Sequence, residues 1–517
     1  MPDPDQFAPT RLDDPPSRRS FSRMASKIVL AHLVLILAIL IPLGIHENRQ
    51  AQRDWDDFKA HWEAKGEIFD LEKLIPPEIP DEENFAAAPI IAEVFNNPDD
   101  NRLSSIDLNE LSGFGDNVHS SNNTQRARGA FGNQLSDHLE KPEDFPTDKL
   151  AAKGLLKALE PLEAILAEFK QASLRPKTKL PLNYSKLTKI DRPHLKPLLS
   201  ITRALSLRAR SHIALNQSIA ARKDILTLLR ILLVFESDES FMSHLISSTF
   251  YNITLPIIWE GLHSNIFISR DLLLIKKSLQ KLAPKKNLVA AIRVERAIAL
   301  ALLENHPEEF YATLKLTYFE DYSDIAALTQ VLRHIGLSQA FLNRNKLTFC
   351  RFFQDNYLTQ NDRILTDWIN MEIAAQSKAN FTSIKDHPYL SAQPNATLLA
   401  TFSADVYYAI AERTAQIATR IDLARIAIAL ELYRREYGDY PKTLTALAPT
   451  YLDTIPNELI TGDPLHYRIK ADGTPIIYSV GLNKTDDRGL LKQDPTQGDW
   501  VWQYTLPKNF TESDWRK

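Results

Sequence analysis

The stretch YRREYGDYP, residues 433–441, ends a long helical pattern that begins near Asp405. Before it, apolar residues recur at spacings of three, four and seven, as one face of a helix requires. These residues are Val406, Ile410, Ile417, Ile421, Ala424, Ile428 and Leu432. Gly438 can adopt the left-handed conformation that ends a helix, and Pro441 cannot continue one. The sequence therefore predicts one long helix that stops within this stretch.

The chain changes its period after this helix. Apolar and polar residues alternate from Leu465 to Lys470, as expected of a strand buried on one face. Asp472-Gly473 is a hairpin turn signal, residues 476–481 predict the returning strand, and residues 501–504 predict a last one. We therefore expect a carboxy-terminal α+β module, residues 404–507, in which the helix lies across a small antiparallel sheet.

Three blocks follow one another in this region. They are ALELYRREYGDYPKTLTALAPTYLDTIP (429–456), TGDPLHYRIKADGTPIIYSVGLNKTDDRG (461–489) and GDW (498–500). In the order and spacing of their Tyr, Gly and Pro residues they resemble the periplasmic domain of the type II secretion major pseudopilin. The resemblance covers about a fifth of the chain, and the rest of the sequence shows none. It implies a pilin-like fold, which in that family serves side-by-side assembly into a filament.

The beginning of the chain departs from the pilin pattern. A processed pilin starts with a short basic leader, a Gly cleavage point and a Phe-Thr-Leu-x-Glu sequence that runs directly into its long helix. Residues 24–45 contain nothing of that kind, and some 360 residues separate them from the pilin-like helix. We therefore expect a pseudopilin-like module carried on a different body.

The loop after the Tyr-Ser-x-Gly strand binds calcium in the pseudopilin family. The corresponding residues here are Asn483, Asp486, Asp487, Asp494 and Asp499. Their side chains offer the oxygen ligands that calcium prefers. Lys484 and Arg488 oppose a divalent cation, so a plain polar hairpin loop is the alternative. The sequence predicts no other metal, no cofactor and no small-molecule substrate.

An apolar run predicts a membrane anchor near the amino terminus. Residues 1–27 are rich in Pro, Asp, Ser and Arg and predict a disordered tail. Residues 28–45 are apolar except for His32, and a helix of that length reaches about 27 Å, close to a hydrocarbon core. Basic residues precede the run and acidic residues follow it. This asymmetry predicts a bacterial inner-membrane protein with a cytoplasmic tail and a periplasmic or extracytoplasmic bulk.

Two other interpretations of this segment stay open. A cleaved signal peptide is one, although the run is long for that role and no small-x-small site follows it. A twin-arginine export signal is the other, because SRRSFSR, residues 17–23, contains two adjacent arginines. We favour a retained signal anchor with a single transmembrane helix.

The middle of the chain predicts helices. Residues 46–147 predict a juxtamembrane helix and an extended linker, because aromatic residues share a helical face and prolines follow. Residues 148–380 predict an irregular α-helical array. Within it, the patterns at 200–215 and 218–235 are two residues apart, which predicts an antiparallel helix pair. Residues 381–403, whose prolines interrupt any periodicity, predict a linker.

Composition and motifs argue against an enzyme and against nucleic-acid binding. The 61 basic residues are balanced by 65 acidic ones, so the chain has no field that attracts nucleic acid. Cys350 is the only cysteine, and the run LTFCRFF predicts that it is a small buried hydrophobe. No recognisable catalytic motif accompanies the histidines of the array. They are His194, His212, His244, His263, His306 and His334.

Three functional hypotheses follow. The first is a membrane-anchored envelope protein with a non-enzymatic structural or protein-interaction role, linked to a type II secretion or pilus-like system. The second makes the helical array a ligand- or partner-binding platform, with the pilin-like unit as a structural cap. The third is an envelope enzyme whose catalytic set is assembled from distant positions. Other envelope proteins are the expected partners.

Overall fold

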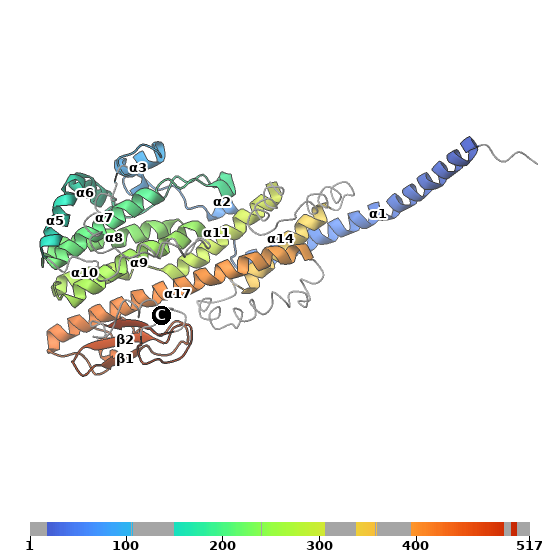
Figure 1. Cartoon of the computed structure of the whole chain (residues 1–517). Helices are drawn as coiled ribbons and strands as arrows, with labels where there is room; N and C mark the ends of the chain where they lie inside the picture. Colours follow the sequence, from blue (N-terminus) through green and yellow to red (C-terminus); the bar gives the residue numbers. More distant parts are fainter. Residues whose placement is uncertain are drawn as a thin grey trace, which may run out of the picture. The chain divides into compact units, whose positions relative to one another are not determined.

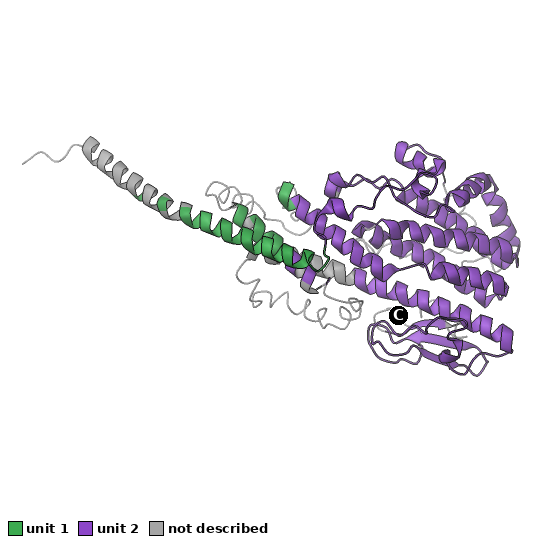
Figure 2. Cartoon of the chain, turned by 180° about the vertical axis from the view of Figure 1, so that it is seen from behind, with its two compact units in different colours: residues 1–67, 303–348 green, residues 68–302, 349–517 purple. Residues whose placement is uncertain are grey.

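The computed structural model describes residues 18–104, 106, 149–238, 240–305, 338–356, 358, 394–490 and 498–503. These residues are mainly helical, with a small antiparallel sheet near the carboxy terminus (Figure 1). The chain forms two compact units, shown in separate colours in Figure 2. They are residues 1–67 with 303–348, and residues 68–302 with 349–517. The expected helical character and the expected antiparallel sheet are confirmed.

The first unit contains helix α1 (Arg18–Glu63) and the beginning of helix α14 (Ser338–Asn356). These helices contact each other through polar side chains. Asn48 Oδ1 accepts a hydrogen bond from the backbone N–H of Ala340 at 2.6 Å, and Gln52 Oε1 accepts one from Asn343 Nδ2 at 2.7 Å. Trp55, one to two turns further along α1, is buried. The second half of α1 is therefore a packed helix with a polar contact surface.

The expected transmembrane helix, residues 28–45, is a wrong prediction. In the part of the chain that the structure describes, no helix is long and apolar enough to cross a membrane. The run is no separate element, because α1 extends from Arg18 to Glu63 and carries charged residues on both sides of it. The extracytoplasmic location, which rested on the charges around this run, stays a prediction.

The second unit begins with short elements and continues into the helical array. The short elements are α2 (Leu71–Leu74), η1 (Phe85–Ala87) and α3 (Pro89–Asn96). The array contains α5 (Lys149–Leu159), η4 (Glu160–Leu162), α6 (Glu163–Ala172), η5 (Tyr184–Lys189), α7 (Leu195–Ala214), α8 (Ser218–Ser237), α9 (Phe241–His263), α10 (Ser269–Leu279) and α11 (Pro284–Asn305), whose last three residues belong to the first unit.

Helices α7 and α8 are the expected antiparallel pair. Asn216, in the turn between them, has a φ of 58°, a conformation that Asn tolerates better than most residues. Arg208 on α7 and Asp224 on α8 lie equally far from this turn. Their side chains are buried and form two hydrogen bonds of 2.9 and 2.7 Å. Loss of either partner would leave a buried charge, so this ion pair fixes how the two helices align.

The carboxy-terminal elements are α17 (Pro394–Tyr437), η7 (Leu444–Leu447), β1 (His466–Ile469), β2 (Pro475–Ser479) and β3 (Trp500–Gln503). The three strands form an antiparallel sheet in the order β1-β2-β3. The register places Tyr467 opposite Ile477, and Ile477 opposite Trp502. These three side chains therefore lie side by side on one face of the sheet.

Helix α17 ends at the expected residue but begins earlier than expected. Gly438 has a φ of 88°, and its N–H donates to the carbonyl of Arg434 at 2.8 Å. This left-handed glycine ends the helix. The helix begins at Pro394, inside the expected linker of residues 381–403, because proline is well tolerated in the first turn of a helix. Residues 381–393 lie outside the described residues.

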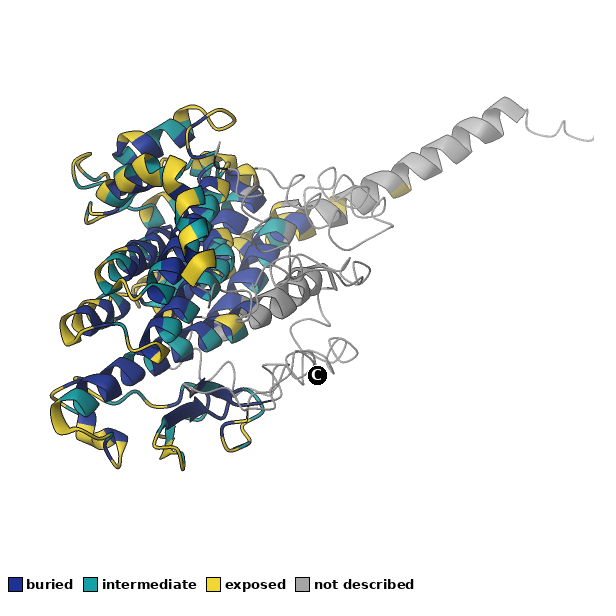
Figure 3. Cartoon of the chain, turned by 60° about the vertical axis from the view of Figure 1, so that its left-hand side comes forward, coloured by how far each residue is buried: buried dark blue, intermediate teal, exposed yellow. Residues whose placement is uncertain are grey.

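Helix α17 is covered from two sides, and Figure 3 shows its buried length. On one side it contacts α9, where Arg420 Nη1 donates to Asn252 Oδ1 at 2.7 Å, and α10. On the other side it contacts β2 and β3, whose Ile477 and Trp502 belong to the same hydrophobic cluster. The buried apolar residues of α17 are Ile410, Ala411, Ala415, Ile417, Ala418, Ile421, Leu423, Ala424, Ile426, Ala427, Ile428, Ala429, Leu430 and Leu432. The array and the sheet thus share one core.

Truncation of Ile428 to Ala should destabilise the array and the sheet together. Ile428 is fully buried in the core that both share, and removal of three methyl or methylene groups there costs about 2–5 kcal/mol. Hydrogen exchange of peptides from α8 and from β2 should accelerate in parallel. Leu490→Ala is the control, because Leu490 is exposed and its truncation should change the free energy of unfolding by less than about 0.5 kcal/mol. Acceleration confined to β2 would contradict the shared core.

Candidate functional site

The turn after α17 is held by a network of tyrosine and glutamate side chains. The carboxylate of Glu431, buried in the last turns of the helix, accepts hydrogen bonds from the hydroxyl of Tyr440 and from Arg434. The hydroxyl of Tyr467, on β1, donates to the carbonyl of Pro441 at 2.7 Å. Burial, together with the neighbouring carboxylate, raises the pKa of Tyr440 above its ordinary value. This network positions the first strand against the end of the helix.

The loop after β2 folds back over the outer side of that strand. Gly489 has a φ of 73°, and a Cβ added there would lie 2.6 Å from Ile476 and 3.2 Å from Tyr478. Only glycine combines this conformation with so close an approach. All five residues of β2 are buried, although α17 can cover only one face of the sheet. The loop therefore covers the second face of the strand.

Asp499 organises this loop from inside. Its side chain is buried and accepts hydrogen bonds from the backbone N–H groups of Asp487 at 3.3 Å and Gly489 at 2.6 Å. Burial raises the pKa of Asp499, and the two N–H groups oppose this rise because they stabilise the charged form. Asn483 Nδ2 donates to Asp487 Oδ2 at 3.1 Å. The fold thus brings three of the expected calcium ligands together.

Asp486 belongs to a different contact group. Its Oδ1 accepts hydrogen bonds from the hydroxyl of Tyr478 at 3.0 Å and from the N–H of Arg488 at 2.7 Å. Its Oδ2 lies 3.7 Å from His466 Nδ1. Burial raises the pKa of Asp486, but the two hydrogen bonds outweigh it, and the pKa lies below its ordinary value. Asp494, the remaining expected ligand, lies outside the described residues.

The oxygens of this loop serve donors of the protein itself. Among the residues that the structure describes, no three His, Cys, Asp or Glu side chains are grouped so that they could hold a metal ion. The calcium loop stays a prediction that depends on Asp494.

The described histidines of the array have separate surroundings. His212, His244 and His263 lie beside Gln217, Thr414 and Trp259, respectively. His306 and His334 lie outside the described residues. The prediction that the chain is not an enzyme stays a prediction. Cys350 is buried, as its apolar neighbours indicated.

His194 has the most unusual surroundings of these histidines. It lies at the start of α7, is 2% exposed, and stacks on Phe95 of α3 with 5.5 Å between the ring centroids. Neither ring nitrogen has a hydrogen-bond partner among the described residues. Asp238, at the end of α8, and Arg192, in the preceding loop, are the charged groups that act on it. Burial is the main cause that lowers the pKa of His194 to about 4.

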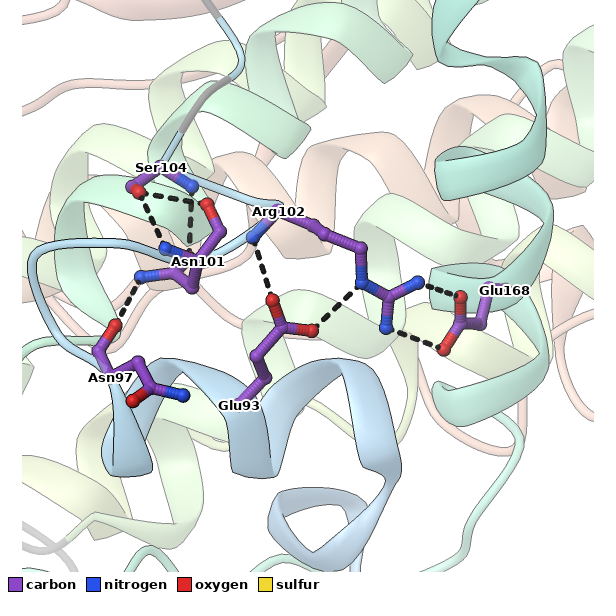
Figure 4. Close-up of polar contacts among 6 residues, drawn as sticks. All are labelled: Glu93, Asn97, Asn101, Arg102, Ser104 and Glu168. Carbon is purple, nitrogen blue, oxygen red and sulfur yellow. Dashed lines mark hydrogen bonds and ion pairs between the residues drawn. The ribbon is translucent and has the colours of Figure 1, made fainter.

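The polar network in Figure 4 fastens α3 to α6. Arg102 Nε donates to Glu93 Oε2 at 2.8 Å, and Arg102 Nη1 donates to Glu168 Oε2 at 2.7 Å. Asn101 Nδ2 donates to the carbonyl of Asn97 at 3.0 Å and closes the loop that carries Arg102. The hydrogen bonds that Arg102 donates to the Glu168 and Glu93 carboxylates raise its pKa. One guanidinium thus bridges two helices, and we interpret the network as structural.

The sequence reasoning missed a surface feature of α10. Arg270, Leu273, Leu274 and Lys277 recur at helical spacing on α10, Lys281 follows two residues after the end of the helix, and all five are exposed. We call these five residues the outward stripe of α10. Their spacing is visible in the sequence, but α10 contains two sets of apolar residues, and the sequence alone does not tell which set is buried. Only the fold shows that the other set, Leu272, Ile275 and Leu279, is buried.

Comparisons with protein-family models, with curated proteins and with solved structures find no match to this chain. Its function is therefore argued from the geometry of the described residues.

Replacement of His194 by Phe should remove part of the pH dependence of stability. His194 stays neutral in the fold down to about pH 4, whereas in the unfolded chain it takes up a proton near its ordinary pKa of 6.5. Protons therefore favour the unfolded chain as the pH falls through this window. The free energy of unfolding of wild type should fall by about 2 kcal/mol between pH 7.5 and 5 for this reason, and the variant should lack this contribution. Urea unfolding at the two pH values measures this difference.

His263→Phe is the control for this measurement, because it also removes a histidine of the array, but one that is exposed. An equal loss of stability in wild type and in His194→Phe would show that burial of His194 does not set the pH dependence.

Replacement of Asp499 by Asn should loosen the loop after β2. The amide has one acceptor oxygen, so it can serve only one of the two backbone N–H groups and presents a donor to the other. The expected cost is about 1–3 kcal/mol. Thermal melts of both proteins, with calcium and with a chelator, measure it. An unchanged melting temperature in the variant would contradict the role of Asp499, and stabilisation of wild type alone by calcium would support the predicted calcium loop.

Proposed function

We propose that this chain is a non-enzymatic platform for protein–protein contact, and that its carboxy-terminal module is an integral part of that platform. The observation that carries the proposal is the burial of α17 between the array and the sheet. Elements that share one close-packed core keep a fixed arrangement. The outer surfaces of the array and the module therefore form one body on which a partner can dock.

The same burial bears on the resemblance to the pseudopilin. A subunit that assembles side by side through its long helix needs a free face on that helix. Here α9 and α10 occupy the face of α17 that the sheet leaves open. The resemblance supports the helix-and-sheet arrangement, and the burial favours a structural cap over a filament subunit. A secretion or pilus-like assembly is the partner class to test first.

The use of polar side chains in this unit also supports a structural role. Asp499, Glu431 and Asp224 are buried acids, and each is hydrogen-bonded to a donor of the chain itself. Acids that serve catalysis must reach a substrate. The buried acids named here hold loops and helices in place instead.

Site-specific photo-crosslinking in cells tests this function. A photoreactive amino acid is placed at exposed positions of the array, Ile219 and Leu273, and of the module, Ile469 and Leu490. We expect discrete products with another protein at one or more of these positions, because a platform must present an exposed contact surface. The same amino acid at Ile428, which is buried, is the control and should give none.

The absence of products at every exposed position, with the chain present and folded, would contradict the proposed function. Products at Ile469 or Leu490 alone would place the contact on the module and argue against its role as a cap.

A further inference from the structure

Helix α10 is amphipathic in an unusual way, because its solvent-facing side is also partly apolar. The outward stripe of α10 places Leu273 and Leu274 between Arg270, one turn before them, and Lys277 and Lys281 after them. The leucine side chains are 50% and 38% exposed. An exposed pair of adjacent leucines within a row of cations differs from the scattered single apolar residues of ordinary surfaces.

Two contacts fix the side of α10 that faces outward. Asp271 is completely buried and forms an ion pair with Arg222 of α8. Lys276 donates to the carbonyl of Tyr451, in the segment that follows α17. These contacts hold the helix on both flanks of its buried side. Rotation that would bury Leu273 would leave the carboxylate of Asp271 without its partner.

The cationic side chains of the outward stripe form no ion pair within the described part of the chain. Arg270, Lys277 and Lys281 have no carboxylate within ion-pair distance among those residues. By contrast, Arg222, on the neighbouring helix α8, is paired with Asp271. The stripe therefore offers an apolar centre with a cationic residue before it and two after it.

Two further exposed apolar residues lie at the starts of α10 and α8. Ile268, just before α10, is 56% exposed, and Ile219, at the start of α8, is 57% exposed. Each lies three residues before a member of the Arg222–Asp271 ion pair, so both lie at the same end of the two helices.

We propose that the outward stripe of α10 binds an acidic segment of a partner protein, with apolar side chains at its centre and Asp or Glu on both sides. This inference rests on the proposed function and names the surface and the chemistry of the partner. Oppositely charged rims align two surfaces, while the apolar centre supplies the attraction once water is displaced.

The arrangement favours a protein over an anionic membrane. A helix that lies on a membrane is apolar along its whole length, with cations on the flanks of that face. In α10 the cations lie along the same line as the leucines, before and after them. A lipid surface would have to cover Arg270 and Lys277 together with the leucines, whereas a protein segment can place a carboxylate beside each cation.

The test uses the full chain with the photoreactive amino acid at Leu273. It is made in three further forms with altered charged side chains. The first is Arg270→Glu/Lys277→Glu/Lys281→Glu. The second is Arg270→Lys/Lys277→Arg/Lys281→Arg, which keeps the charge. The third is Lys149→Glu/Lys153→Glu/Lys157→Glu, which makes the same charge change on an exposed row of α5.

We expect the crosslinked product at Leu273 to fall about tenfold in the first form and to persist in the other two. Mass spectrometry should place the crosslink in an acidic, apolar peptide of the partner. Circular dichroism of each form checks that the fold is kept, since all altered side chains are exposed.

Three outcomes would overturn the inference. In the first, the chain sediments with vesicles of equal parts phosphatidylglycerol and phosphatidylcholine, and only the first form fails to do so. This result would show that the stripe binds a lipid surface. A product of twice the mass of the chain would assign it to a second copy. Crosslinked products at Ile469 but not at Leu273 would support the proposed function but show that the stripe is not the contact surface. If the proposed function itself is wrong, no product is expected at any position.

Discussion

From Ile426 to Leu432 every residue of α17 is buried, so neighbouring elements must cover this helix on all sides. A helix that is apolar all round cannot lie on a protein surface. Ala424, Ala427 and Ala429 have small side chains that let neighbours approach closely, and the larger residues between them fill the space. The array covers one side of the helix, and the sheet covers another. Their common attachment to α17 is therefore what makes them one unit.

The layers outward from α17 follow from the same requirement. The sheet covers one side of the helix, and its central strand then has a second face to bury. The loop after β2 meets that need because Gly489 allows the backbone to approach Ile476. Asp499 holds the loop there through two backbone N–H groups. The acids that resembled calcium ligands thus have a structural use that follows from burial of the strand.

The parts of this fold that the sequence predicted are those set by local backbone chemistry. Gly438 ends α17 and Asn216 turns the chain between α7 and α8, and each has a positive φ that few residues tolerate. The failed or missing predictions depend on distant contacts. Nothing near Gly489 in the sequence indicates that it lies against β2, and Phe95 gives no sign that it stacks on His194. The predicted span of residues 28–45 is wrong, because no helix among the described residues is long and apolar enough to cross a membrane.

The orientation of α10 shows how such a distant contact decides what a surface presents. The helix has two apolar sets, and the hydrophobic effect alone would bury either. Asp271 resolves the choice, because a fully buried carboxylate needs the guanidinium of Arg222. Burial of Leu273 and Leu274 instead would bring Arg270 toward the core and remove that partner. The exposed leucines are therefore a fixed consequence of a buried ion pair, and a surface fixed in this way can meet a partner without first rearranging.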